Sequence, residues 1–203
     1  MSPVKCHMLC LQTIVIKIGS AVLTSPDKSL NESILVHLAK QIARFFEEGH
    51  RILIVSSGAV ASGRGIRDLA DEKRRFVRRQ MYAGMGQAKL MWKYHQVFSA
   101  HEIPVAQCLI TRENFANQLE HENLIKTLEG YLRFRVIPIL NENDIVADQA
   151  INFGGNDFLA ALTAVSIKAD KLIILSDIEG LYDTDPKTNP KAKLIPVVDR
   201  VSE

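Results

Sequence analysis

A lysine inside an apolar run is the first residue of this sequence with the potential for chemistry. Lys17 interrupts the run IVIKI, and Gly19 and Ser20 follow it. An unpaired ammonium group is costly to bury, so this lysine needs an anionic partner. A phosphate would be a suitable partner, because glycine lets the backbone approach phosphate oxygens closely. The alternative is a structural lysine on an edge strand, with its amine reaching solvent along the alkyl stem.

A second candidate is the small polar turn in VSSGAVASGRG. Ser57 and Gly58 follow an apolar run and precede helix-forming residues, which leaves backbone N–H groups available to an anion. Gly58 and Gly63 have the spacing of a P-loop, but Arg64 stands where that motif has lysine, so the P-loop is excluded. A tight turn that binds no ligand would use the same small residues.

Two further segments place Asn and Asp side chains after apolar residues. Asn141 and Asp144 belong to NEND, which we expect to hang over the site as a hairpin and to bind ammonium and amide-like groups. A ligand-free turn rich in Asn and Asp is the alternative. Asn156 and Asp157 follow two glycines, and we expect one of them to cap the next helix and the other to be available for chemistry.

The last apolar run ends in Ser176 and Asp177, which open the acidic segment SDIEGLYDTDP. A calcium-binding loop is excluded, because the glycine and the terminal glutamate of an EF-hand are missing. The segment is either a solvated acidic loop or the edge of a nucleotide-binding site.

Short apolar runs alternate with amphipathic stretches along the chain. Continuous Val, Ile and Leu runs suit a parallel sheet covered on both faces, and the alternation predicts an α/β domain. The expected strands are residues 13–18, 51–56, 104–110, 136–140 and 171–175, and the expected helices include residues 35–46, 76–98, 124–132 and 158–168. Ligands of such sheets bind beyond the carboxyl ends of the strands, where the candidate residues lie.

Composition restricts the class of protein. The chain has 203 residues, of which 47% are hydrophobic and 24% charged, which is enough for one domain with a substantial core. A net charge of +2 predicts neither a nucleic-acid nor a membrane partner, and no run of 18 apolar residues or secretory signal is present. Three cysteines suggest reduced thiols in the cytoplasm, and Cys6, His7 and Cys10 lack the second half of a zinc site.

In their order along the chain, these segments resemble the amino acid kinase family, and within it the glutamate 5-kinases. The resemblance rests on IKIGSAVLT, VSSGAVASGR, YAGMGQAKLM, CLITRENF, PILNENDIVA, GGNDFLAALTA and ADKLIILSDIEGLYDTDPKTNP. It implies a three-layer α/β/α sandwich with a mainly parallel sheet, and ATP and Mg²⁺ as cofactors. It also implies phosphorylation of the γ-carboxylate of L-glutamate, the first step of proline synthesis, often with feedback inhibition by proline.

The resemblance assigns a role to each matching residue. Lys17 would contact the transferring phosphate, and Asp157 would orient that lysine. The residues expected to bind glutamate are Ser57, Gly58, Asn141, Asp144 and Asn156, and those expected to meet ATP are Lys17, Gly19, Ser20, Ser176 and Asp177. No residue is assigned to a metal.

Two departures from the family pattern affect these expectations. Gly155 stands where family members usually carry an aspartate. The family also continues beyond the position of Glu203 into a glycine-rich segment with a second lysine. We therefore expect residues 1–203 to form the kinase domain without the C-terminal part of its nucleotide-binding half. The alternatives are a catalytically impaired glutamate- or proline-binding or oligomerisation module, and another amino acid kinase.

A homo-oligomer is a further expectation. The long helix expected over residues 76–98 carries several large apolar side chains that fit a dimer face, but core packing explains the same pattern and is the favoured interpretation. They are Met81, Met85, Leu90, Met91 and Trp92.

Overall fold

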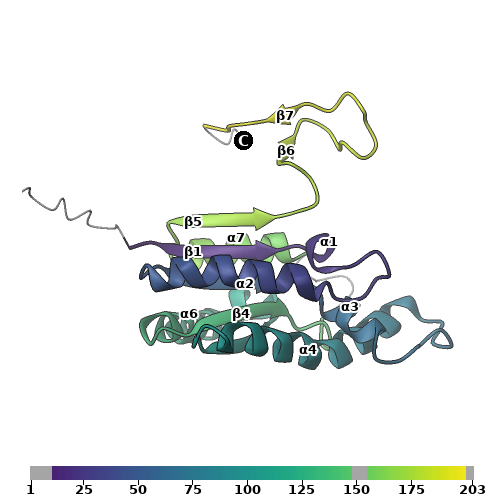
Figure 1. Cartoon of the computed structure of the whole chain (residues 1–203), viewed down its shortest axis with the longest axis horizontal. Coiled ribbons are helices and arrows are strands. Elements are labelled where there is room, and N and C mark those ends of the chain that lie inside the picture. The colour runs from purple at the N-terminus through teal and green to yellow at the C-terminus, as the bar shows by residue number, and fades with distance from the viewer. Residues whose placement is uncertain (1–10, 148–154, 200–203) are drawn as a thin grey trace, which may run out of the picture.

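The computed structural model describes residues 11–147 and 155–199. Its centre is a five-stranded parallel sheet with the order β3-β4-β2-β1-β5 (Figure 1). The strands are β1 (Thr13–Ile18), β2 (Arg51–Ser56), β3 (Val105–Ile110), β4 (Ile137–Glu142) and β5 (Lys171–Leu175). All five strands agree with the sequence prediction to within two residues at either end.

The largest difference from the predicted strands is at the end of β4. This strand does not stop at Leu140, because Asn141 and Glu142 stay in register with Leu109 and Ile110 of β3. The first half of the NEND segment is therefore part of the sheet, and only Asp144 and the residues after it turn away. The rest of the expected hairpin, from residue 148, lies outside the described residues.

Lys17 lies in an interior strand. β1 is hydrogen-bonded to β2 on one side and to β5 on the other, and all its residues are buried. The edge-strand interpretation of this lysine is therefore wrong, and its amine must find a partner inside the protein.

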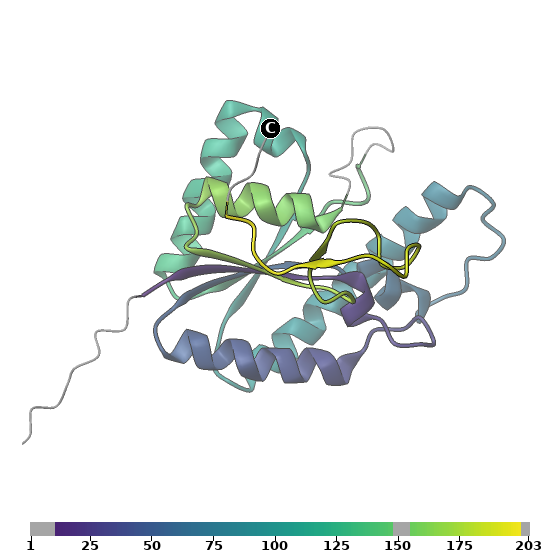
Figure 2. The same cartoon turned by 90° about the horizontal axis from the view of Figure 1, so that it is seen from above.

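Helices cover both faces of the sheet (Figure 2). On one face α2 (Glu32–Glu47) and α4 (Arg75–Ser99) pack against Ile14, Ile16 and other residues of a large core cluster. On the other face α6 (Gln118–Arg133) and α7 (Asn156–Ser166) close a second cluster around Val15. The three-layer α/β/α sandwich is thus confirmed, as are the four expected helices.

Two helices approach each other closely beside the carboxyl ends of the strands. They are α3 (Ala59–Arg64) and the first half of α4. A Cβ at Gly86 would clash with the carbonyl of Ala59, and a Cβ at Gly63 would clash with the carbonyl of Tyr82. Glycine at these points therefore sets the distance between α3 and α4. The short helices α1 (Ser20–Leu23) and α5 (Glu113–Ala116) follow β1 and β3.

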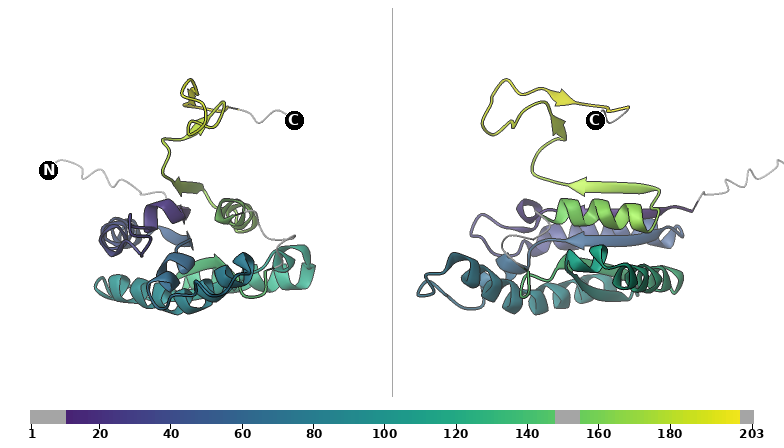
Figure 3. Two further views of the ribbon diagram at one scale, coloured as in Figure 1. Left: turned by 90° about the vertical axis from the view of Figure 1, so that its right-hand side faces the viewer. Right: turned by 180° about the vertical axis from the view of Figure 1, so that it is seen from behind.

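The C-terminal segment forms a small antiparallel pair, β6 (Leu181–Tyr182) and β7 (Leu194–Ile195). It stands off the main sheet beyond β5 (Figures 1 and 3). β5 itself is an edge strand, and Ile174 is 48% exposed on it.

The apolar residues of α4 divide between the core and the surface. Leu90 is fully buried, whereas Met81 and Trp92 are 41% and 58% exposed. No helix in the two described ranges is long and apolar enough to cross a membrane. Cys6, His7 and Cys10 lie outside the described residues.

Candidate active site

A polar cavity of about 280 Å³ opens where β2 and β4 end and α3 and α7 begin. It lies at the carboxyl edge of the sheet, where ligands of parallel sheets bind. Six residues named from the sequence line it: Ser20, Ser57, Gly58, Asn141, Asp144 and Asn156. The folded chain therefore gathers the expected glutamate-binding residues around one space.

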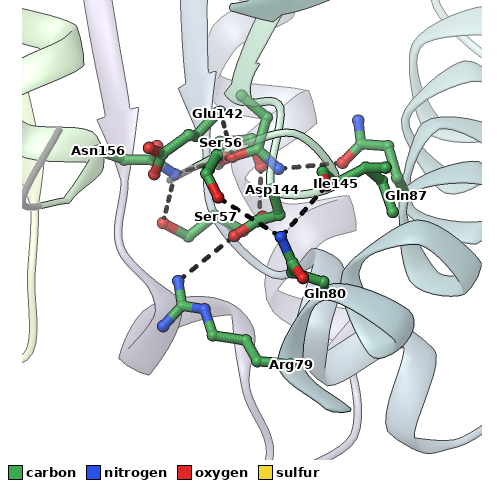
Figure 4. Close-up of polar contacts among 11 residues, drawn as sticks. Ser56, Ser57, Arg79, Gln80, Gln87, Glu142, Asp144, Ile145 and Asn156 are labelled. Atoms are coloured by element: carbon green, nitrogen blue, oxygen red, sulfur yellow. Dashed lines mark hydrogen bonds and ion pairs between the residues drawn. The ribbon is translucent and has the colours of Figure 1, made fainter. Parts of the chain in front are cut away.

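Asn156 connects three elements at this cavity (Figure 4). Its amide nitrogen lies 3.0 Å from the carbonyl oxygen of Ser56, 2.9 Å from Ser57 Oγ and 3.0 Å from Asn141 Oδ1. Because these partners come from β2, its following turn and β4, one side chain fixes the start of α7 against both strands.

Asn141 is oriented from its other side by a residue of α4. Its side chain is buried, and its Nδ2 donates to Gln87 Oε1 at 3.0 Å. Its Oδ1 accepts from the backbone N–H of Glu142 at 2.9 Å. Sequence reasoning did not assign Gln87 to the site, although it belongs to the quoted segment YAGMGQAKLM.

Asp144 lies at the mouth of the cavity beside an arginine that the sequence analysis did not assign. Its Oδ1 is 3.5 Å from Arg79 Nη2, and its side chain is only 16% exposed (Figure 4). Burial raises the pKa of this carboxyl, while the charge of Arg79 and its hydrogen bond act in the opposite direction. Gln80 holds the turn after Asp144 by donating to the carbonyl of Ile145 at 3.2 Å.

Lys17 forms an ion pair with Asp157, which provides the anionic partner that a buried lysine needs. Its amine lies 2.7 Å from Asp157 Oδ1, and the lysine side chain is 10% exposed against 64% for the aspartate. Gly19 leaves room for that amine, since a Cβ there would lie 3.1 Å from Lys17 Nζ. The open side of this ion pair is therefore toward solvent, where an anionic ligand can approach.

The expectation that Asn156 or Asp157 caps α7 is wrong. The capping position is occupied by Gly155, with φ at +131°, and no side chain caps the helix. Both candidates are instead inside the helix and are engaged elsewhere, Asn156 with β2 and β4 and Asp157 with Lys17.

Ser176 and Asp177 do not line the cavity. They follow β5, whose last carbonyl, at Leu175, accepts a hydrogen bond from the N–H of Gly19 at 3.0 Å. Lys187 contacts Asp177 at 2.6 Å, and this hydrogen bond is the main reason why the pKa of Asp177 is lowered. These residues form a second, exposed part of the sheet edge.

A parallel sheet with a paired lysine and a polar cavity at its carboxyl edge is an arrangement that can bind an anionic ligand. The profile described as "Amino acid kinase family" matches residues 12–202. The chain therefore belongs to the amino acid kinase family.

Curated relatives named glutamate 5-kinase match almost the whole chain. Those of Photorhabdus laumondii and Geobacter sulfurreducens are 44% and 43% identical to it over 192 residues, which is 95% of this chain and 52% of each relative. The relative from Proteus mirabilis is 42% identical over the same length. The chain thus spans about half the length of the curated relatives it matches.

Solved structures support the fold at low sequence identity. An isopentenyl phosphate kinase superposes with a TM-score of 0.63 at 18% identity, covering 93% of this chain and 81% of that one. The UMP kinase of Bacillus anthracis gives a TM-score of 0.58 at 18% identity, covering 90% and 72%. Both comparisons confirm the expected fold class.

Proposed function

We propose that this chain transfers the γ-phosphate of ATP to the γ-carboxylate of L-glutamate, forming γ-glutamyl 5-phosphate. The observation that carries the proposal is the start of α7, where Asn156 faces the polar cavity and the next residue, Asp157, holds Lys17. One helix turn thus connects a small-molecule cavity to a cation suited to phosphate. The relatives named glutamate 5-kinase favour glutamate as the molecule in the cavity.

The cavity offers complementary groups for an amino acid. Asp144 provides a carboxylate for the ammonium group, and its raised pKa reflects the partial burial that strengthens such an ion pair. Arg79 and Arg64 line the same cavity and supply positive charge for a carboxylate. Ser57 and Asn156 add neutral polar groups, so a zwitterion with a second carboxylate is a suitable ligand.

Phosphoryl transfer requires positioning and charge neutralisation more than a covalent protein intermediate. The glutamate carboxylate is itself the nucleophile and is ionised at neutral pH, so no general base is needed. In this proposal Lys17 stabilises the negative charge of the transferring group, and Asp157 keeps its amine in place. Gly19 leaves the approach to that amine open.

Mg²⁺ fits this site as an ion that arrives with the nucleotide. The described residues contain no group of three His, Cys, Asp or Glu side chains able to hold a metal. Mg²⁺ is usually held by substrate phosphates, waters and one or two carboxylates, so a fully protein-built cage is not required. The ion would supply charge neutralisation on the phosphates, and Asp157 is the exposed carboxylate nearest to Lys17 that could face it.

The proposal extends to the first step of proline synthesis in the cytoplasm, with proline as a feedback inhibitor and with a homo-oligomeric assembly. The family resemblance supports the pathway and the inhibitor. The free thiol of Cys108 is compatible with a reducing compartment, and burial raises its pKa to about 11, which keeps it unreactive. The exposed Met81 and Trp92 provide apolar surface for assembly.

The direct test is an assay of the chain with ATP, Mg²⁺ and hydroxylamine, which traps the acyl phosphate as glutamyl hydroxamate. We expect product with L-glutamate, and we expect no ATP consumption with aspartate, UMP or N-acetylglutamate. Absence of product while glutamate still binds in calorimetry would favour the non-catalytic module. ATP consumption with one of the other acceptors instead would indicate a different amino acid kinase.

A further inference from the structure

We propose that a second cavity, next to the candidate glutamate cavity, binds phosphate as a dianion. This arginine pocket has a volume of about 180 Å³ and is lined by Val60, Arg64, Arg75, Arg78, Arg79 and Tyr82. Four of its six lining residues are therefore arginines. The inference does not require the proposed kinase reaction, although Arg64 and Arg79 line both this pocket and the glutamate cavity.

The positive charge of the arginine pocket is only partly compensated, by Asp144 beside Arg79 and by Glu72, whose pKa the charge of Arg78 helps to lower. Among the described residues its single ion pair joins Arg79 to Asp144, at 3.5 Å, and none joins Arg64, Arg75 or Arg78. Neighbouring Arg74 makes the contrast clear, since it binds both carboxylate oxygens of Glu72, at 2.9 and 2.7 Å. Like charges gathered in a small space repel each other, so the pocket favours a bound anion.

The position of these arginines on α4 strengthens this argument. Arg75, Arg78 and Arg79 are spaced three and four residues apart, so they share one face of the helix. They occupy the first two turns of α4, whose first turn contains no acidic residue. The positive end of a helix dipole disfavours arginine and favours anions. A bound anion would therefore reduce both the repulsion among the arginines and their repulsion by the helix dipole.

The size and charge of the pocket select the class of ligand. Its volume of about 180 Å³ is well above the space that a single buried water needs, so a phosphate group can enter. Guanidinium groups bind phosphate oxygens in pairs of parallel hydrogen bonds, and several arginines can share one tetrahedral dianion. A monocarboxylate offers only one charge and two oxygens, so we expect it to bind more weakly.

The arginine pocket is physically connected to the glutamate cavity. Arg64 and Arg79 line both, and Arg79 also contacts Asp144. A phosphate that draws Arg79 away would remove the counter-charge of Asp144. Occupancy of one cavity should therefore alter ligand binding in the other.

The test is isothermal titration of the full 203-residue chain with inorganic phosphate, with ionic strength held constant by chloride. We expect saturable binding with one phosphate per chain, about tenfold weaker binding in Arg78→Gln, and unchanged binding in the control Lys40→Gln, at an exposed position of α2 away from the pocket. Acetate should give no saturable signal. Arg75→Gln is a second variant in case Arg78→Gln alters the melting temperature, and it should weaken binding to a similar extent.

Three results would overturn the proposal. The first is the absence of saturable phosphate binding to the unaltered chain. The second is an equal loss of affinity in Lys40→Gln and Arg78→Gln, which would indicate that only the overall charge of the chain matters. The third is tight binding of a single-stranded oligonucleotide without any binding of inorganic phosphate, which would make the arginines a nucleic-acid surface.

Discussion

Two parts of the same sheet edge are built in different ways. Around the glutamate cavity, Asn156 reaches Ser56 across 100 residues of sequence, and Asn141 reaches Gln87 across 54. Beyond β5, Asp177 finds its partner Lys187 only 10 residues away, in an exposed loop. The first part is shaped by the packing of the whole domain, and the second is shaped locally.

This contrast indicates which side chains are held in a fixed position before a ligand binds. Side chains held between β2, β4, α4 and α7 keep their geometry without a ligand, which reduces the entropy lost on binding. Side chains in an exposed loop keep little geometry of their own, and their ion pairs contribute little to stability. Substitutions should therefore have large effects in the first part and small effects in the second.

The largest expected effect is that of Lys17→Ala on turnover. Loss of a charge that acts on the transferring group should lower turnover by about 10²–10³, with little change in glutamate affinity, because Lys17 does not line the cavity. Hydroxamate formation and calorimetry measure the two quantities separately. Lys40→Ala, at an exposed position of α2, is the control. Near-normal turnover in Lys17→Ala would remove this lysine from the mechanism.

The next effect concerns the close contact that positions α3 and α4. Gly86→Ala should lower the free energy of unfolding by about 3 kcal/mol, because a Cβ there meets the backbone of Ala59 and Gly63. Gly130→Ala, in the interior of α6, should raise it by up to ~1 kcal/mol, since a Cβ there meets no heavy atom within 4 Å beyond its own stretch of helix. Chemical denaturation measures both, and equal effects would contradict the packing argument.

A smaller effect is expected for the amide that joins the strands. Asn156→Ala leaves Ser56, Ser57 and Asn141 without their shared donor, so glutamate affinity should fall by about 10–100-fold. Calorimetry measures the change. The control is Asn189→Ala, which removes an exposed hydrogen bond to Thr184 near β6. If the control weakened glutamate binding as much, the distinction between the two parts of the edge would fail.

The smallest effect is expected at the exposed ion pair. Lys187→Ala should leave the melting temperature almost unchanged at neutral pH. Because Lys187 lowers the pKa of Asp177, any stability from the pair is present above the ordinary value of 3.8 and is lost as the pH falls through the lowered value in the folded state. Thermal melts of both proteins against pH should converge in acid. A large difference at neutral pH would show that this loop is part of the cooperative fold.

Local patterns were sufficient to predict most of the fold. β1, β2 and β5 match their predicted limits because each is an apolar run bounded by polar or turn residues. The end of β4 was missed because Asn141 and Glu142 are polar, and only their pairing with β3 keeps them in the sheet.

The site was predictable where chemistry leaves a local signal. Lys17 in an apolar run could be recognised, and its partner Asp157 was available from the family resemblance. Gln87 and Arg79 were not assigned, because polar residues on a long helix look like a solvated face until the fold shows what they contact. Helix capping at the start of α7 was wrongly expected for a similar reason. Asn156 and Asp157 instead contact Ser56 and Lys17, which are about 100 and 140 residues away in sequence.

The central claim is that this chain carries a preformed cavity for L-glutamate, and its most direct measurement is calorimetric titration of the chain with L-glutamate beside N-acetyl-L-glutamate. The acetyl group removes the ammonium charge that Asp144 is proposed to bind. We predict saturable binding of one L-glutamate per chain and no detectable binding of the acetylated compound. Failure to bind L-glutamate, or equal affinity for both compounds, would contradict the account.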